Sequence, residues 1–315
     1  MDYDLKDFKK IMKLSYQHTR KEFQRLQTNC MRVYDRNLPA YPVTVDVYGA
    51  YVKIQNFGDA ELETDVVCDA ASRMLYVPID HVYYQDRKKR IGIEQHVLQN
   101  KSGESSIGTL EVEESGLRFL VDLQNRIDTG LFLDHMPTRV LVREHAFGAR
   151  VLNLFAYTGT FSVYAAAGGA EKVISVDLSN TYLSWAERHL AINGYFGDMF
   201  RCVRSDVKAY LAAGAVEDGP FDIIILDPPA FSNSHNMEGN FKVQRDYLWY
   251  IKQSMKHLAQ EGMLIFSTNL SGFQFDSGRL PHTSCTNISE QTIPPGFSKK
   301  RRAHTCWLIR HNQSS

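Results

Sequence analysis

The stretch VLNLFAYTGT, residues 151–160, decides the fold of this chain. Its apolar first half, Val151–Phe155, predicts a short buried strand, and its second half predicts a tight turn. The small-residue segment Phe161–Ala167 then predicts a helix that Gly168 and Gly169 end. A strand, a turn and a helix in this order form the first half of a βαβ unit, from which parallel sheets are built.

A second predicted strand, Lys172–Val176, delivers Asp177 eighteen residues after Gly159. An acidic side chain about twenty residues after such a glycine meets ribose hydroxyls in dinucleotide-type folds. A pyrophosphate cofactor is disfavoured, because the turn has one glycine where the G-x-G-x-x-G pattern has three. S-adenosylmethionine carries ribose and adenine without phosphates and suits this turn; an ordinary βαβ turn without a ligand is the alternative. The turn residues concerned are Asn153, Phe155, Tyr157 and Gly159.

Strand and helix patterns alternate from Val151 to Asn269, which predicts a right-handed, doubly wound parallel sheet that binds ligands at its carboxyl edge. Ser179 lies in a capping segment before one predicted helix. Asp206 follows the third strand, where it either accepts from an adenine amino group or only caps the next helix. The further predicted elements are the strands Phe200–Val203, Phe221–Leu226 and Met263–Thr268 and the helices Thr181–Asn193 and Gln244–Leu258.

The segment Leu226–Phe231, with the sequence LDPPAF, ends an apolar run and predicts a stiff loop at the carboxyl edge of the sheet. Pro228 and Pro229 fix φ and remove two backbone donors. Asp227 can accept hydrogen bonds from a planar base, and Phe231 can stack on it. Two prolines can also simply end a strand, but the cofactor unit upstream favours a catalytic loop.

The chain combines several motifs: Arg32–Pro39 with Val45-Asp46, Asp128–His135, Phe155–Gly159, Val176–Ser179 with Tyr182 and Trp185–Arg188, Asp227–Ser234, Val243–Asp246 and His304–Trp307. In combination they resemble the bacterial 23S rRNA guanine-N7 methyltransferase domain, the C-terminal half of a fused large-subunit rRNA methyltransferase. The resemblance covers nearly the whole chain. It implies an α/β, Rossmann-like class I methyltransferase fold with a seven-stranded, mostly parallel sheet, preceded by a small α+β domain and an N-terminal helix.

The same resemblance implies which residues bind S-adenosylmethionine. Phe132 and Asp134 would close over its methionine end, Asp177 would bind the ribose, and Asp206 would lie near the adenine. The full set expected to bind the cofactor is Phe132, Asp134, Asn153, Phe155, Tyr157, Gly159, Asp177, Ser179, Asp206 and Asp227.

The target base is expected to be held by Asp227, Pro228 and Phe231, which the resemblance marks as the catalytic residues. The chain departs from the family at Met136, where arginine is common, and at Asn269–Gly272, which lacks the basic residues expected there. Both departures concern the binding of the substrate more than that of the cofactor.

The expected reaction is methylation of guanine N7 in large-subunit rRNA. N7 carries an in-plane lone pair, so attack on the sulfonium methyl needs no general base, and alignment is the main task of the enzyme. A 5-methylcytosine enzyme needs a cysteine that adds to C6, and the strand-end segment Phe266–Asn269 has none. The sequence is also compatible with methylation of an exocyclic or side-chain amide nitrogen, and with a non-catalytic RNA-binding or assembly module.

Charge and composition limit the partners of the chain. The 36 basic and 36 acidic residues cancel, so any contact with RNA must be local. Candidate patches are Arg87–Arg90, the N-terminal segment and Lys299–Arg302, the last being favoured because it lies in a predicted hairpin before the final strand. The five cysteines show no metal or redox spacing, so no metal is expected. No apolar run approaches the length of a membrane span, which indicates a cytoplasmic enzyme.

Three parts are predicted: an amphipathic helix within residues 1–28, a small α+β domain over 29–127 and the methyltransferase domain over 128–315. The small domain is expected to roof the active site, with a hairpin at Val43–Gln55 and short strands between Gly108 and Val121. In the resembling family the helix connects to a preceding methyltransferase half, so a separate or fused guanine-N2 methyltransferase is the implied partner.

Overall fold

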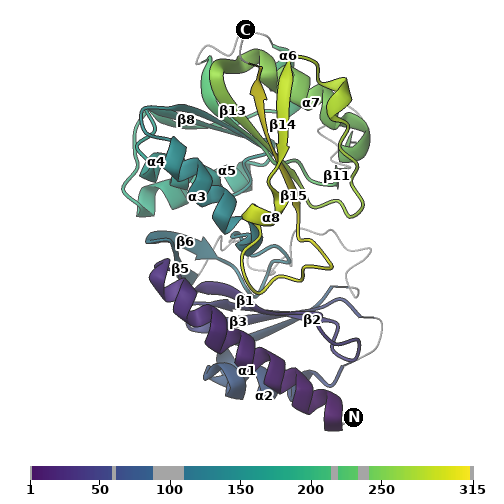
Figure 1. Cartoon of the computed structure of the whole chain (residues 1–315). Helices are drawn as coiled ribbons and strands as arrows, with labels where there is room; N and C mark the ends of the chain where they lie inside the picture. The colour runs from purple at the N-terminus through teal and green to yellow at the C-terminus, as the bar shows by residue number, and fades with distance from the viewer. Residues whose placement is uncertain (1, 59–61, 88–109, 214–218, 233–240, 313–315) are drawn as a thin grey trace. The chain divides into compact units, whose positions relative to one another are not determined.

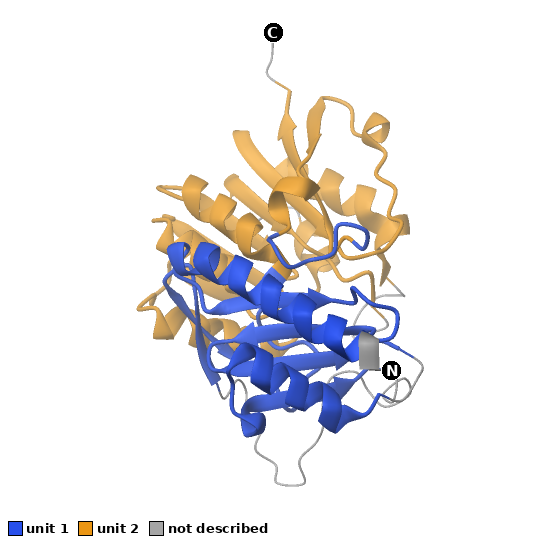
Figure 2. Cartoon of the chain, turned by 60° about the horizontal axis from the view of Figure 1, so that its bottom comes forward, with its two compact units in different colours: residues 1–133, 294–301 blue, residues 134–293, 302–315 orange. Residues whose placement is uncertain are grey.

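The computed structural model describes residues 2–58, 62–87, 110–213, 219–232 and 241–312, and it divides the chain into two compact units (Figure 2). Unit 1 is Met1–Leu133 with Pro294–Arg301, and unit 2 is Asp134–Ile293 with Arg302–Ser315. The division into three domains stays a prediction. Lys88–Arg90 of one expected basic patch and Asn233 and Ser234 of the Asp227–Ser234 motif lie outside the described residues.

Unit 2 is built on a seven-stranded sheet in which five neighbouring strands are parallel (Figure 1). The inner parallel strands are rich in buried Val, Ile and Leu because helices cover both faces of the sheet, whereas the edge strand is more polar and less buried. The two strands at one edge run antiparallel. The predicted seven-stranded, mostly parallel sheet is confirmed. In spatial order its strands are β14 (Thr283–Asn287), β15 (Thr305–His311), β13 (Leu258–Thr268), β10 (Phe221–Leu226), β7 (Arg150–Leu154), β8 (Lys172–Asp177) and β9 (Phe200–Arg204).

Helices cover the two faces of this sheet (Figure 1). The chain enters at β7, adds β8 and β9 on one side, and then returns to add β10 and β13 on the other. The order of the strands therefore reverses between β7 and β10, which is where open α/β sheets bind ligands. One face carries α3 (Met136–His145), α4 (Thr160–Ala167) and α5 (Asn180–Ile192), and the other carries α6 (Val207–Ala212) and α7 (Val243–His257).

The run Lys299–Arg302 lies just before the final strand, in the connection between β14 and β15. These two strands are consecutive and pair antiparallel, which confirms the expected hairpin before the final strand. The connection is long and irregular: it holds α8 (Ser289–Thr292), and its Ser298 donates a backbone hydrogen bond to Asp35 rather than to a strand partner. The second antiparallel neighbour of β15 is β13.

Unit 1 is a four-stranded sheet with two helices on one face (Figure 1). Apolar residues of the N-terminal helix, such as Phe8 and Met12, are buried there, which confirms the predicted amphipathic helix. Part of the region that the sequence left unassigned forms a second helix and a strand. The elements are α1 (Asp2–Arg25), β1 (Cys30–Asp35), β2 (Val43–Tyr48), β3 (Tyr51–Asn56), α2 (Thr64–Leu75), the 3-10 helix η1 (Ile79–His81), β4 (Val82–Asp86), and the hairpin of β5 (Leu110–Glu114) and β6 (Leu117–Val121).

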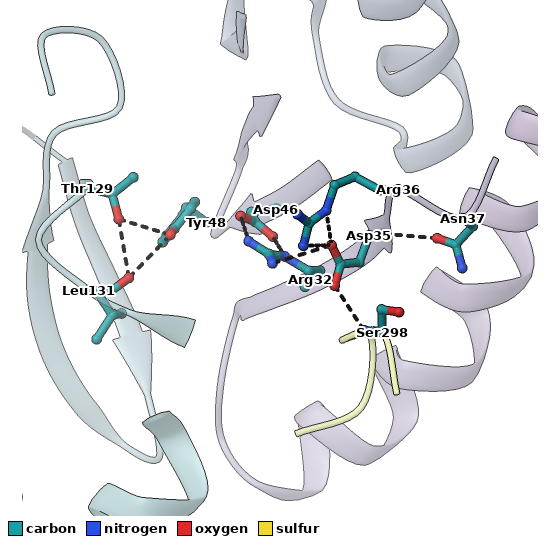
Figure 3. Close-up of polar contacts among 9 residues, drawn as sticks. All are labelled: Arg32, Asp35, Arg36, Asn37, Asp46, Tyr48, Thr129, Leu131 and Ser298. Carbon is teal, nitrogen blue, oxygen red and sulfur yellow. Dashed lines mark hydrogen bonds and ion pairs between the residues drawn. The ribbon is translucent and has the colours of Figure 1, made fainter. Parts of the chain in front are cut away.

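The other face of the unit 1 sheet is polar and yet buried. Tyr48 and Thr129 share a hydroxyl hydrogen bond of 2.9 Å (Figure 3). Lys53 donates to the carbonyl of Leu123, and Gln55 donates to that of Ile127 at 2.8 Å. These contacts give the Tyr48, Lys53 and Gln55 side chains partners in the segment that follows β6. Within the described part of the chain, no helix combines the length and apolar character that crossing a bilayer requires.

Candidate cofactor and catalytic site

The turn between β7 and α4 contains three left-handed residues. Phe155, Tyr157 and Gly159 have φ angles of 56°, 50° and 69°. A Cβ on Gly159 would lie 2.5 Å from the Cβ of Ala186 in α5, so glycine is required by the close approach of α5 as well as by its φ. Left-handed conformations at the two aromatic residues cost about 1–3 kcal/mol each, and such strain concentrates at ligand sites.

Asp177 links this turn to the end of β8. Its Oδ2 accepts from the backbone N–H of Tyr157 and its Oδ1 from that of Ser179, each at 2.9 Å. Burial raises the pKa of this carboxyl, although the backbone hydrogen bonds favour its ionised form. A carboxylate offers about four acceptor sites, so it can still accept from a ligand hydroxyl. The turn and the acidic residue that the sequence assigned to a ribose therefore lie together.

Three other expected cofactor residues have partners within the protein. Asn153 is buried, and its amide donates to the hydroxyl of Ser162 at 2.9 Å. Ser179 caps α5, and Asp206 caps α6 by accepting from a backbone N–H at 2.9 Å. The capping role considered for Asp206 is thus observed, while its second oxygen remains an acceptor. The ligand contacts of these residues stay predictions.

Asp227 lies at the carboxyl end of β10, beside the point where the strand order reverses. Ser267 of β13 donates to its Oδ1 at 2.6 Å. The Nε2 atom of His135 lies 3.6 Å from its Oδ2, and the Asp227 side chain is 25% exposed. The carboxylate is therefore held on one oxygen and faces a ring nitrogen with the other, and it keeps exposed lone pairs for a planar ligand.

Two buried histidines stack next to Asp227. The rings of His135 and His304 are 4.1 Å apart between centroids and 8° from parallel. Nδ1 of His304 lies 2.8 Å from Oδ2 of Asp134, and its Nε2 lies 3.1 Å from the hydroxyl of Thr292. These contacts link the short 3-10 helix η3 (Leu133–His135) to α8 and to the start of β15.

His135 is held in its neutral form. Burial lowers its pKa to about 4, and the nearby His304 acts in the same direction, while Asp227 and Asp134 oppose the change. Its Nδ1 has no hydrogen-bond partner in the described structure. The tautomer with its proton on Nε2 therefore directs the N–H toward the carboxylates and leaves no N–H buried without an acceptor.

The residues Asp134, His135 and His304 bring their ligand atoms within 4.8 Å of one another, a spacing that can suit a metal ion. The stacking of the two rings opposes this use. Imidazole lone pairs lie in the ring planes, and nearly parallel planes 4.1 Å apart between centroids do not direct them to one point ~2.1 Å from each nitrogen. The expectation that the chain uses no metal stays a prediction.

The residues expected to hold the base surround the two prolines. Pro228 is buried, whereas Phe231 is 60% exposed. Phe231 begins β11 (Phe231–Ser232), which pairs with β12 (Phe241–Lys242), so its backbone is fixed while its ring is accessible. Phe132 belongs to unit 1 and Asp134 to unit 2, and the prediction that they close over the cofactor together stays a prediction.

Ser267, His135 and His304 complete the site, although the sequence did not single them out as site residues. A signal existed for Ser267, because it interrupts an apolar strand near its carboxyl end, in the strand next to β10. Each histidine belongs to a motif of the family resemblance, Asp128–His135 or His304–Trp307, but nothing in the sequence pairs the two. The two residues lie 169 positions apart, and only the fold brings their rings together.

The chain matches known methyltransferases in sequence. The profile of the S-adenosylmethionine-dependent methyltransferase family matches residues 67–277. Ribosomal RNA large subunit methyltransferase K of Neisseria meningitidis is 37% identical over 98% of this chain and 88% of that protein. Ribosomal RNA large subunit methyltransferase K/L of Pseudomonas paraeruginosa is 39% identical over 91% of this chain but only 39% of that protein. The chain thus spans about two fifths of the length of this K/L relative.

Solved structures share the fold. A protein from Streptococcus mutans, assigned as a SAM-dependent methyltransferase, superposes with a TM-score of 0.74 at 24% identity, covering 97% of this chain and 81% of its own. A further structure, assigned as a methyltransferase and complexed with SAH, gives a TM-score of 0.76 at 24% identity with the same coverage. A SAM-dependent methyltransferase from Agrobacterium tumefaciens gives 0.65 at 17% identity, covering 90% of each chain. At these identities the likeness shows the fold alone.

Proposed function

Because this chain belongs to the S-adenosylmethionine-dependent methyltransferase family, we propose that it transfers a methyl group to guanine N7 of large-subunit rRNA. The relatives named for large-subunit ribosomal RNA support RNA as the substrate class. The observation that supports a planar base is the corner at Asp227: a carboxylate held by Ser267, then two prolines, then the exposed ring of Phe231.

The carboxyl edge of unit 2 fits the cofactor of this family. The turn with Gly159 suits a ligand without phosphates, and Asp177 keeps lone pairs for a ribose hydroxyl. The free oxygen of the capping residue Asp206 is placed at the end of the next strand, where it can accept from an adenine amino group. When bound, S-adenosylmethionine supplies an electrophilic methyl group, and its positive charge passes from sulfur to the methylated base.

The residues of the chain orient the base. Asp227 accepts from guanine N1–H and the exocyclic amine, and because N7 already carries a lone pair, the carboxylate removes no proton. The same negative charge stabilises the positive charge that develops on the base. Phe231 stacks on the ring, at about 1–3 kcal/mol for such a contact. Correct alignment of nucleophile and methyl group can lower the barrier by about 7–11 kcal/mol.

The structure offers a physical reason against a 5-methylcytosine reaction. Cys306 of β15 pairs with Ser267 in the ladder, which makes it a neighbour of Asp227. It is fully buried, and burial together with the charge of Asp227 raises the pKa of its thiol. Attack on a pyrimidine requires the thiolate, so this cysteine is poorly suited to it.

Radiolabelled S-adenosylmethionine and deproteinised large-subunit rRNA test the proposal. We expect label in the RNA and 7-methylguanosine after digestion and nucleoside mass spectrometry. Asp227→Asn is the matched variant, since its amide keeps one acceptor for Ser267 but cannot accept from two guanine donors, and it should lose methyl transfer by a much larger factor than it loses cofactor affinity. Label in protein, on an exocyclic amine or in 5-methylcytosine would contradict the proposal. Absence of cofactor binding in calorimetry would indicate a non-catalytic module.

A further inference from the structure

A buried carboxylate in unit 1 joins segments that are far apart in the sequence (Figure 3). The Asp35 side chain, at the end of β1, is 1% exposed, and its Oδ1 lies 2.8 Å from Nη2 of Arg36 and 3.9 Å from Nη1 of Arg32. Its Oδ2 accepts from the backbone N–H of Ser298 at 2.9 Å. Asp46 of β2 accepts twice from Arg32, at 2.7 and 2.8 Å. The geometry of these cations is thereby fixed by charge-assisted hydrogen bonds.

Ser298 belongs to a segment that we call the strap, Pro294–Arg301, which folds with unit 1 (Figure 2). The strap lies directly on β1. Gly296 has a φ of +93°, and a Cβ there would collide with the carbonyl oxygen of Arg32. The guanidinium carbon of Arg32 lies 4.3 Å from the ring centroid of Phe297. The strap is therefore anchored up to Ser298, and it presents three exposed cations beyond that point: Lys299, Lys300 and Arg301.

Next to the strap anchor, Arg36 and a third arginine, Arg87, lie over one aromatic ring. The guanidinium carbons of Arg36 and Arg87 lie 4.7 and 5.0 Å from the ring centroid of Phe57. Burial lowers the pKa of Arg87; Asp128 opposes this change, and the positive charges of Arg32 and Arg36 add to it. The charge of Arg87 is thus within reach of those of Arg32 and Arg36, so the three guanidinium groups belong to one cluster.

A count of the charges in this region shows that the excess of positive charge lies in the strap. The three arginines are matched by the carboxylates of Asp35, Asp46 and Asp128. The strap then adds three positive charges, and no carboxylate of the described residues forms an ion pair with them. Arg302, the next residue, is different, because it pairs with Glu290 at 3.3 Å. In a chain of zero formal net charge, this local excess is the kind of patch that binds phosphates.

We propose that the strap cations and the arginine–phenylalanine stacks at Phe57 and Phe297 form a binding surface for single-stranded RNA. Phosphates bind the three strap cations, and unpaired bases stack on the guanidinium and phenyl planes, as aromatic and arginine surfaces do for single strands. Double-stranded RNA fits less well, because its bases are not exposed for stacking. The inference rests on the proposed function, since it states how unit 1 holds the RNA substrate.

Salt-dependent binding of the full chain to a fluorescent single-stranded RNA oligonucleotide tests the phosphate contacts. The triple variant Lys299→Ala, Lys300→Ala, Arg301→Ala should bind about tenfold or more weakly at low salt. Each phosphate contact on a single strand contributes about 0.7 to the slope of log affinity against log salt, so the slope should become shallower by about 2. The matched control is the triple Lys6→Ala, Lys10→Ala, Lys13→Ala on α1, which removes the same charge from exposed positions of the same unit.

Phe57→Leu tests the stacking contacts separately. Leucine keeps the apolar contact but removes the planar face, so affinity should fall about fivefold or more while the salt slope stays unchanged. The proposal would be overturned if the strap and α1 triple variants weakened RNA binding equally. It would also be overturned if the wild-type chain bound a duplex of the same sequence as tightly as the single strand.

Calorimetry with S-adenosylmethionine should give unchanged affinity in every variant and so show that unit 2 remains folded. If the wild-type chain methylates rRNA and the strap variant binds RNA as tightly as the wild type, only the proposed binding surface is refuted. If the wild type does not methylate RNA, the proposed function itself fails.

Discussion

Replacing Gly159 by alanine tests whether the cofactor turn depends on its close packing against α5. The φ of 69° costs an alanine about 1–2 kcal/mol. The new Cβ would lie 2.5 Å from the Cβ and 3.2 Å from the Cα of Ala186, and overpacking of this kind costs about 1–3 kcal/mol more. We expect the free energy of unfolding of unit 2 to fall by about 2–5 kcal/mol. Affinity for S-adenosylmethionine should also fall, because a shifted turn breaks the Tyr157–Asp177 hydrogen bond.

Gly194 provides the matched control, since its φ is 83° and a Cβ there would have no neighbour within 4 Å. Gly194→Ala should therefore cost only the conformational part, about 1–2 kcal/mol. Urea unfolding monitored by tryptophan fluorescence gives the free energy of unfolding of unit 2 in both variants, because all three tryptophans of the chain, at positions 185, 249 and 307, lie in unit 2. Equal destabilisation of the two variants, with unchanged cofactor affinity in calorimetry, would refute the role assigned to the approach of α5.

Three further variants address individual side chains. Asp177→Ala should weaken S-adenosylmethionine binding at least ~10-fold in calorimetry, and unchanged affinity of this variant would remove the ribose role. Because the pKa of Asp177 is raised, wild-type binding should already weaken at a pH above the usual carboxyl range as the solution is acidified. The pKa of His135 is about 4 in the folded state against an ordinary 6.5, so between these pH values the folded state binds fewer protons than the unfolded state. The free energy of unfolding should therefore fall as the pH is lowered from 6.5 to 4, by up to about 1.4 kcal/mol per pH unit. His135→Gln should flatten that slope in urea titrations across this range, and an equally steep slope would contradict the assignment. Phe231→Ala should reduce methyl transfer with cofactor affinity intact, whereas loss of both would indicate a collapsed loop.

The local pattern of the sequence determined the framework of unit 2. Phe221–Leu226 is apolar except for the exposed Asp222, and it forms a strand with those same bounds because its apolar side chains are stable only when buried. The glycine pair after Ala167 and the capping residue Ser179 mark helix ends through interactions within a few residues. Parallel strands place their carboxyl ends at one edge, so the sequence also predicted Asp177 and Asp227 on the same side of the sheet.

Tertiary structure alone decided the contacts that hold these residues in place. Ser267 reaches Asp227 because β13 lies beside β10, and His304 stacks on His135 because β15 follows a long excursion of the chain. The attachment of the strap to Asp35 spans 263 positions. Such contacts carry no periodic signal, since each depends on one side chain meeting another after all the intervening elements have packed. The sequence therefore specified the elements and the edge at which a ligand is expected, and packing specified the partners of each candidate functional group.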